Sequence, residues 1–154
     1  MGTNAGLYDT DFYAWVQDQA ALLAARRFEE LDLPHLVEEL QLMGNSERGE
    51  LSNRRSVLLA HLLKLQIAAE PLPYVYDRAQ RGWHLIGTEQ RLQLRKLLRR
   101  NPSLRSTIPD ELPDAYAIAR LQTALALGVD DASVPLACPW TAEQVLDETF
   151  WPEP

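Results

Sequence analysis

The sequence predicts an all-α fold, a helical bundle of four main helices plus short helices. Apolar residues recur every three or four positions along most of the chain, which is the period of an amphipathic helix. Residues that start and stop helices separate these stretches. No two segments alternate apolar and polar side chains in the way that paired strands do.

The bundle is organised around a long central helix, predicted over residues 46–69. At about 100° per residue, its second half is apolar around most of its circumference. Such a helix has to be covered by neighbours on several sides. The main apolar stripe comprises Leu51, Leu58, Leu62, Leu65 and Ala69, with Leu59, Leu63 and Ile67 beside it.

Two helices are predicted before the central one. The first begins at Asp9, which can cap it while Tyr8 packs on Tyr13, and continues to about Arg27. The second begins at Asp32, with a proline in its first turn.

We expect the second predicted helix to break or kink before the central helix begins. The expected position is near Gly44, because an unbroken helix would place Glu47 on the apolar stripe. The sequence therefore favours two separate helices here.

Three more elements follow the central helix. Two prolines in residues 71–73 predict its end, and residues 71–82 are predicted as a loop. Helices are then predicted over residues 82–100 and 110–127, the latter stopped by Gly128. Thr141 and Gln144 form a capping box that opens a last short helix, reaching about Phe150.

Length and composition predict one globular domain over residues 7–152, preceded by a flexible N-terminus at residues 1–6. The chain has 154 residues, of which 46% are hydrophobic and 24% charged. Its single cysteine excludes an internal disulfide and fits a reducing compartment. We find no signal peptide and no apolar run long enough for a membrane span, so we expect a cytoplasmic protein.

The net charge of −7 is distributed in three blocks. Residues 1–50 carry 10 acids and 3 bases, residues 51–105 carry 3 acids and 11 bases, and residues 106–154 carry 9 acids and 1 base. We expect the blocks to neutralise one another in the fold, and a basic face for an anionic partner is the alternative.

A series of short motifs gives the chain a resemblance to a known family. It resembles an uncharacterised bacterial family, known as domain of unknown function number twenty-nine and abundant in cyanobacteria. The resemblance runs from about residue 7 to residue 152, and the order and spacing of the motifs carry it. They are Tyr8-Asp9, Asp11-Phe12-Tyr13, Trp15, Leu31-Asp32, Leu36, Glu38-Glu39-Leu40, Met43-Gly44, Ser46-Glu47-Arg48, His61-Leu62-Leu63-Lys64, Gln90-Arg91, Asn101-Pro102-Ser103-Leu104 and Cys138-Pro139-Trp140-Thr141.

The resemblance implies a compact all-helical protein of the bacterial cytoplasm. It implies no activity and no cofactor, because the family has none assigned. The chain differs from the usual pattern at His35, where asparagine is expected, and at Leu65, where an aromatic residue is expected.

One group of residues has the chemistry of a metal site. His35 is one helical turn from both Glu38 and Glu39, and Glu47 and His61 are the other members of this candidate polar cluster. Carboxylate-bridged metal sites in bundles use glutamates with a Glu-x-x-His step, whereas here the order is reversed and occurs once. The alternative is that the glutamates pair with arginines and that His61 lies on a polar strip.

A second group could bind an anion. The candidate anion-binding face, on the helix predicted over residues 82–100, could contact nucleic-acid phosphates. The chain as a whole is acidic and no aromatic residues alternate with this row, which favours a solvated or internally paired helix face. The face comprises Arg91, Arg95, Lys96, Arg99 and Arg100, with Arg105 beyond it.

The familiar catalytic motifs are absent from the sequence. Cys138 precedes a proline near a helix start, and we interpret it as a packed side chain rather than a nucleophile. We therefore expect a non-catalytic protein-interaction or regulatory module, with another protein or a second copy as its partner. Nucleic-acid binding and a metal-dependent enzyme are the alternatives.

Overall fold

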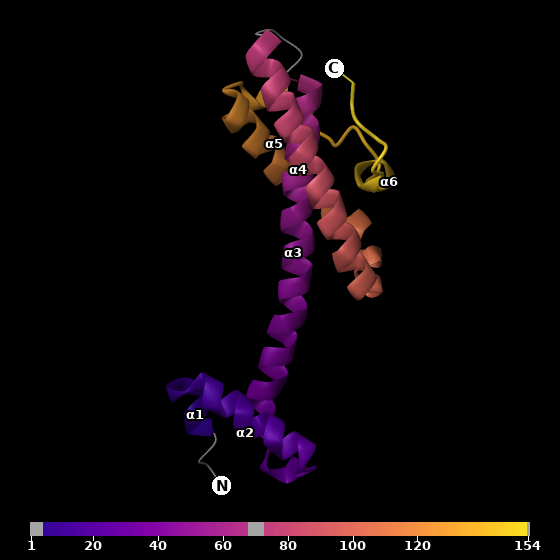
Figure 1. The fold of residues 1–154 in the computed structure, drawn as a ribbon. Helices are drawn as coiled ribbons and strands as arrows, with labels where there is room; N and C mark the ends of the chain where they lie inside the picture. The colour runs from indigo at the N-terminus through magenta and orange to yellow at the C-terminus, as the bar shows by residue number, and fades with distance from the viewer. Residues whose placement is uncertain (1–4, 68–72, 154) are drawn as a thin grey trace. The chain divides into compact units, whose positions relative to one another are not determined.

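A computed structural model describes residues 5–67 and 73–153 (Figure 1). The chain divides into two compact units, Met1–Ser46 (unit 1) and Glu47–Pro154 (unit 2). The prediction of one domain over residues 7–152 stays a prediction. The α-helices are α1 (Ala5–Thr10), α2 (Phe12–Ala24), α3 (Leu33–Ile67), α4 (Pro73–Arg100), α5 (Ile108–Leu127) and α6 (Ala142–Leu146), and the 3-10 helices are η1 (Phe28–Glu30), η2 (Pro102–Thr107) and η3 (Asp131–Ser133).

The predicted all-α class is confirmed, since no strand occurs in residues 5–67 or 73–153. The prediction of four main helices is also confirmed, by α2, α3, α4 and α5. α1 includes two of the residues predicted as a flexible N-terminus, and residues 1–4 lie outside the described residues.

The central helix is longer than predicted. α3 begins at Leu33 and is unbroken to Ile67, so the predicted break near Gly44 is wrong. A glycine inside a helix costs only about 1 kcal/mol, which one turn of a long helix tolerates. Glu47, whose place on the stripe suggested the break, accepts a hydrogen bond from Asn101 Nδ2 at 3.0 Å. The predicted end of this helix, at Ala69, lies outside the described residues.

The loop predicted over residues 71–82 is helical from Pro73 onward. Proline at a first helical position is compatible with a helix start, which explains why it opens α4 here. The end of α6 is also earlier than predicted, at Leu146 rather than about Phe150, but two other predicted boundaries are confirmed. Gly128 ends α5 with a φ of +65°, and the capping box of Thr141 and Gln144 opens α6.

The core of unit 2 surrounds the second half of α3. Leu51, Leu58, Leu59, Leu62 and Leu63 are each 0% exposed. The packing side chains come from α4, α5, η2 and the segment from residue 134 to residue 151. The prediction that this leucine-rich helix is covered on several sides is therefore confirmed.

α4 and α5 each lie against the second half of α3 in unit 2 (Figure 1). On the α4 side, a Cβ built on Gly87 would lie 3.8 Å from Leu58 Cδ1. On the α5 side, Thr123 Oγ1 donates a hydrogen bond to the carbonyl of Ala60 at 3.2 Å. Small side chains at these contacts let the helix backbones approach closely.

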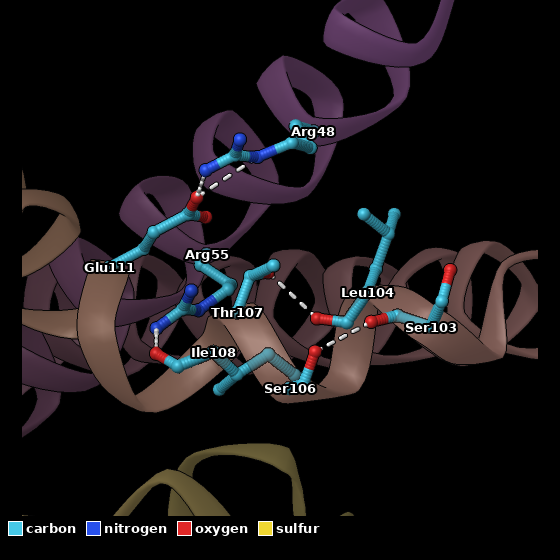
Figure 2. A network of polar contacts seen from close by, with 8 residues as sticks. All are labelled: Arg48, Arg55, Ser103, Leu104, Ser106, Thr107, Ile108 and Glu111. Atoms are coloured by element: carbon cyan, nitrogen blue, oxygen red, sulfur yellow. Dashed lines mark hydrogen bonds and ion pairs between the residues drawn. The ribbon is translucent and has the colours of Figure 1, made fainter.

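A buried arginine joins α3 to the start of α5 (Figure 2). Arg55 is 1% exposed, and its Nη2 donates to the carbonyl oxygen of Ile108 at 2.9 Å. Two turns earlier in α3, Arg48 forms an ion pair with Glu111, which is one turn after Ile108 in α5. Burial lowers the pKa of Arg55, because the charged guanidinium loses water that the single carbonyl does not fully replace.

Unit 1 consists of α1, α2, η1 and the first part of α3. Asp11, rather than the predicted Asp9, caps α2, and its carboxylate accepts from Ala14 N at 3.0 Å. Asp9 is inside α1, where its backbone already belongs to a helix. Among the described residues of unit 1, only Trp15, Gln19 and Leu22 are buried.

Truncating a leucine at the centre of unit 2 should be strongly destabilising. We expect Leu62→Ala to lower the free energy of unfolding by about 2–5 kcal/mol, because it removes buried methyl groups and leaves a cavity. Leu121→Ala is the matched control, since Leu121 is 60% exposed. Urea unfolding followed by circular dichroism measures both. A similar loss in the two variants would contradict the described core.

Candidate functional site

Two of the three unit 1 members of the candidate polar cluster, His35 and Glu39, are bonded within unit 1. His35 Nδ1 lies 2.7 Å from Asp32 Oδ2, and its ring stacks on Tyr8 with a centroid distance of 3.8 Å. Glu39 accepts a hydrogen bond from the Tyr8 hydroxyl at 2.6 Å. Glu38 is exposed. The histidine and one glutamate therefore hold α1 against α3.

The unit 2 members, Glu47 and His61, also have partners of their own. Glu47 is bonded to Asn101, and His61 Nδ1 lies 2.7 Å from the carbonyl oxygen of Val57, one turn earlier in α3. Burial lowers the pKa of His61. Across the part of the chain that the structure describes, no group of three His, Cys, Asp or Glu side chains could hold a metal ion. The metal-enzyme alternative gains no support from these contacts.

Asp32 is the centre of the unit 1 network. Its carboxylate Oδ2 accepts from Trp15 Nε1 at 3.0 Å and contacts His35, while its backbone N–H donates to Gln19 Oε1 at 2.8 Å. The sequence identified Asp32 only as a helix start. The available signal was the Asp-x-x-His spacing in the first turn of a helix, which puts the two side chains on one face.

The electrostatics of this network favour a charged pair. Burial alone would raise the pKa of Asp32, but hydrogen bonds from His35 and Trp15 outweigh burial and lower it. The bond to Asp32 raises the pKa of His35. The bond to Glu39 raises the pKa of Tyr8 to about 12, so this hydroxyl stays a donor. The network joins α1, α2 and α3 through Tyr8, Trp15, Gln19, Asp32, His35 and Glu39, and we call it the latch of unit 1.

The outer faces of α2 and α3 in unit 1 carry exposed apolar side chains. On α3, Leu33, Val37 and Leu40 (the α3 stripe) are 51–65% exposed and follow one another at intervals of four and three residues. On α2, the corresponding set (the α2 stripe) is 37–48% exposed. The α2 stripe comprises Phe12, Val16 and Leu23.

Charged side chains are scarce beside these stripes. Asp18 is the only charged residue of α2. In the first twelve residues of α3 the acids are Glu38 and Glu39, and Glu39 is bonded to Tyr8. Glu38 is about 200° around the helix from Leu40. Exposed apolar area without interspersed charge is typical of a protein-contact surface.

The candidate anion-binding face is divided by the structure. Arg91 is only 2% exposed, so its assignment to an exposed face is wrong, and Arg95 pairs with Glu148. Lys96, Arg99 and Arg100 are exposed. The helical period placed Arg91 and Arg95 in one row, but the C-terminal segment covers the first and pairs with the second.

Trp151 packs over Arg91. The Arg91 guanidinium carbon lies 4.5 Å from the centroid of the indole ring, and Arg91 Nε donates to the carbonyl oxygen of Val145 at 2.9 Å. His84 meets the same ring edge-on at a centroid distance of 4.3 Å. A Cβ on Gly87 would lie 3.0 Å from two ring atoms. Gly87 therefore provides the space that the indole occupies.

Cys138 is half-buried, and its thiol donates a hydrogen bond to the carbonyl oxygen of Trp140, with Sγ 3.4 Å from that oxygen. Burial raises the pKa of its thiol. A raised pKa lowers the thiolate fraction and therefore the reactivity of a cysteine. These contacts support the interpretation of Cys138 as a packed side chain.

Alanine at two glycines of α4 should give opposite effects. Gly82 has no atoms near a built Cβ, so Gly82→Ala should raise the free energy of unfolding by roughly 0.5–1 kcal/mol, as removal of a helical glycine does. Gly87→Ala should lower it, because the new methyl displaces Trp151. Urea unfolding of both variants tests this, and equal stabilisation would contradict the Trp151 packing.

The latch of unit 1 should depend on pH. The pKa of His35 is raised above its ordinary value of 6.5, so its contribution to stability is complete below about pH 6.5 and is lost as pH rises through the raised value. The pKa of Asp32 is lowered below 3.8, so its contribution is lost only as pH falls below about 3.8.

An NMR titration of the three histidines measures this dependence. We expect one ring to titrate above pH 6.5 and the His35→Asn variant to lack that signal, while His61 and His84 titrate below it because burial lowers their pKa values. If the signal that His35→Asn removes titrates below pH 6.5, the His35–Asp32 pair is not formed.

No helix in residues 5–67 or 73–153 has the length and apolar character needed to cross a bilayer.

Comparison with known proteins identifies a family but no described relative. No curated protein and no solved structure matches the chain. Residues 7–151 match the family described as "Domain of unknown function DUF29". The chain therefore belongs to the DUF29 family, whose function is unknown.

Proposed function

We propose that this chain is a non-catalytic protein-interaction module and that two copies associate through the α2 and α3 stripes of unit 1. One observation carries the proposal, the uncharged apolar surface that unit 1 exposes on both helices. The single cysteine fits a reducing bacterial cytoplasm as the setting.

Unit 1 has little core of its own. Its described residues bury Trp15, Gln19 and Leu22, and one of these three is polar. A chain of about 60 residues or fewer buries a smaller fraction of its surface on folding than a larger domain does, and it is marginally stable alone. Burying the α2 and α3 stripes against a partner would supply apolar area that unit 1 lacks.

The exposed apolar area matches what an interface requires. A specific interface takes about 800 Å² from each partner. Apart from Leu42, nine large apolar side chains of unit 1 are 37–74% exposed, and aromatic side chains among them bury on the order of 150–250 Å² each when covered. The nine are Phe12, Tyr13, Val16, Leu23, Phe28, Leu33, Val37, Leu40 and Met43.

A second copy suits this surface better than a charged partner. The spacing of Leu33, Val37 and Leu40 is that of one coiled-coil seam, which pairs with an identical seam. A two-fold contact brings like residues together, and these stripes contain no charge that would repel its own copy. Two-fold dimers are also the commonest oligomers.

A charge placed on the α3 stripe should separate the two copies. We expect Leu40→Glu to raise the dissociation constant of the dimer by about tenfold or more, because a carboxylate would be buried without a partner. Light scattering after size exclusion gives the mass of each species, and sedimentation equilibrium gives the dissociation constant.

Leu42→Glu is the matched control. Leu42 is 52% exposed on the same helix but about 200° around it from Leu40, so the dimer should be retained. A wild-type chain that is monomeric at high micromolar concentration would overturn the proposal. Equal dissociation in the two variants would also overturn it, because the α3 stripe would then have no special role.

A further inference from the structure

Unit 2 contains a cavity between α5 and residues 136–138. Its volume is about 410 Å³, which falls within the range of about 300–1,000 Å³ typical of small-molecule sites. Its apolar wall includes Leu112, Pro113, Leu121 and Leu136. Leu121 and Leu136 are 60% and 83% exposed, so an occupant of the cavity would also cover them.

Two polar groups on the wall already have partners. The Tyr116 hydroxyl donates to the carbonyl oxygen of Pro135 at 2.6 Å, and Cys138 Sγ contacts the carbonyl oxygen of Trp140. Because both are satisfied within the protein, neither requires a polar group from a ligand. The bulk of a complementary ligand should therefore be apolar.

Arg120 differs from these two groups. Its Nε donates to the carbonyl oxygens of Val134 and Pro135, both at 3.1 Å, and its Nη2 donates to that of Asp131 at 2.6 Å. All three acceptors are neutral, and no ion pair among the described residues includes Arg120. A guanidinium has five N–H donors, so some remain for a ligand.

The carbonyls hold the Arg120 cation in place at the wall of the cavity. A cation that is already fixed loses little side-chain freedom when it binds, which favours affinity. Asp114, next to the lining residue Pro113, and Asp131, whose carbonyl oxygen binds Arg120, are both exposed acids, and they disfavour multiply charged anions more than singly charged ones. This combination selects a ligand with one negative charge.

We propose that the cavity binds a small amphipathic carboxylate. The apolar tail lies against Leu112, Pro113 and Leu121, and the carboxylate accepts hydrogen bonds from Arg120. The site is independent of the surface proposed for self-association, since every residue that lines it belongs to unit 2.

Cys138 provides a local readout, because it lines the cavity and is the only cysteine of the chain. We expect octanoate to slow the reaction of this thiol with a disulfide reagent in the full-length protein. Octanoate should protect at a concentration about tenfold lower than octanol or octylamine, because a hydrogen bond to a charged group contributes at least this factor. Equal protection by octanol would overturn the assignment of the carboxylate to Arg120.

Two variants locate the ligand. Ala117 lines the cavity, and Ala117→Phe should fill it and weaken octanoate binding about tenfold or more in isothermal titration calorimetry. Ala126→Phe places the same side chain at an exposed position of α5 outside the cavity and should leave binding unchanged. If octanoate fails to bind, or if the two variants weaken its binding equally, the cavity is not the site.

Arg120→Gln tests the cation. The variant should bind octanoate and octanol with similar affinity, whereas the unaltered chain prefers octanoate. Circular dichroism checks that this variant is folded, and Ala117→Phe tests the site independently if it is not. Retention of the full preference for octanoate in a folded Arg120→Gln variant would overturn the role of the guanidinium.

Discussion

The burial of the second half of α3 is the constraint on which unit 2 depends. Leucines occupy so much of its circumference that no single neighbour could cover it, and the core draws on α4, α5 and the C-terminal segment together. Small residues on α5 let its backbone approach that of α3 closely. Ala115 and Ala119 are both 0% exposed, and Thr123 reaches the backbone of α3 itself.

Charge neutralisation supports this packing without driving it. In unit 2, the pairs Arg48–Glu111 and Arg95–Glu148 join bases of α3 and α4 to acids of the last third of the chain. Such partly exposed pairs contribute up to about 1 kcal/mol each, whereas burying one leucine contributes roughly 1.5–3 kcal/mol. These ion pairs between the blocks of charge therefore contribute less to the stability of unit 2 than the buried leucines do, and their main effect is to align α3 and α4 with the last third of the chain.

Local signals in the sequence predicted local structure well. The apolar period, the capping box at Thr141 and the stop at Gly128 each depend on residues within one or two turns, and the structure confirms each. The break near Gly44 was predicted wrongly, because Gly44 and Glu47 are unfavourable by local rules, whereas in the structure Glu47 accepts a hydrogen bond from Asn101, which is distant in sequence.

The candidate sites were harder to predict, because they depend on segments distant in sequence. Arg91 and Arg95 are equivalent in the helical period, and only the path of the C-terminal segment, which brings Trp151 to Arg91, distinguishes them. Trp15 meets Asp32 through the turn between α2 and α3. Neither contact has a spacing that a single sequence reveals.

Arg120 contacts the segment from Asp131 to Pro135 through three backbone carbonyls. The path of this segment therefore does not depend on which side chains it carries. Backbone oxygens at Asp131 and Pro135 would be present whatever side chains stood there, so α5 fixes this segment through atoms that every residue carries. Leu136, which follows directly and is highly exposed, can therefore change without moving the chain. Related proteins could alter the shape of the cavity mouth at this position while keeping the same scaffold.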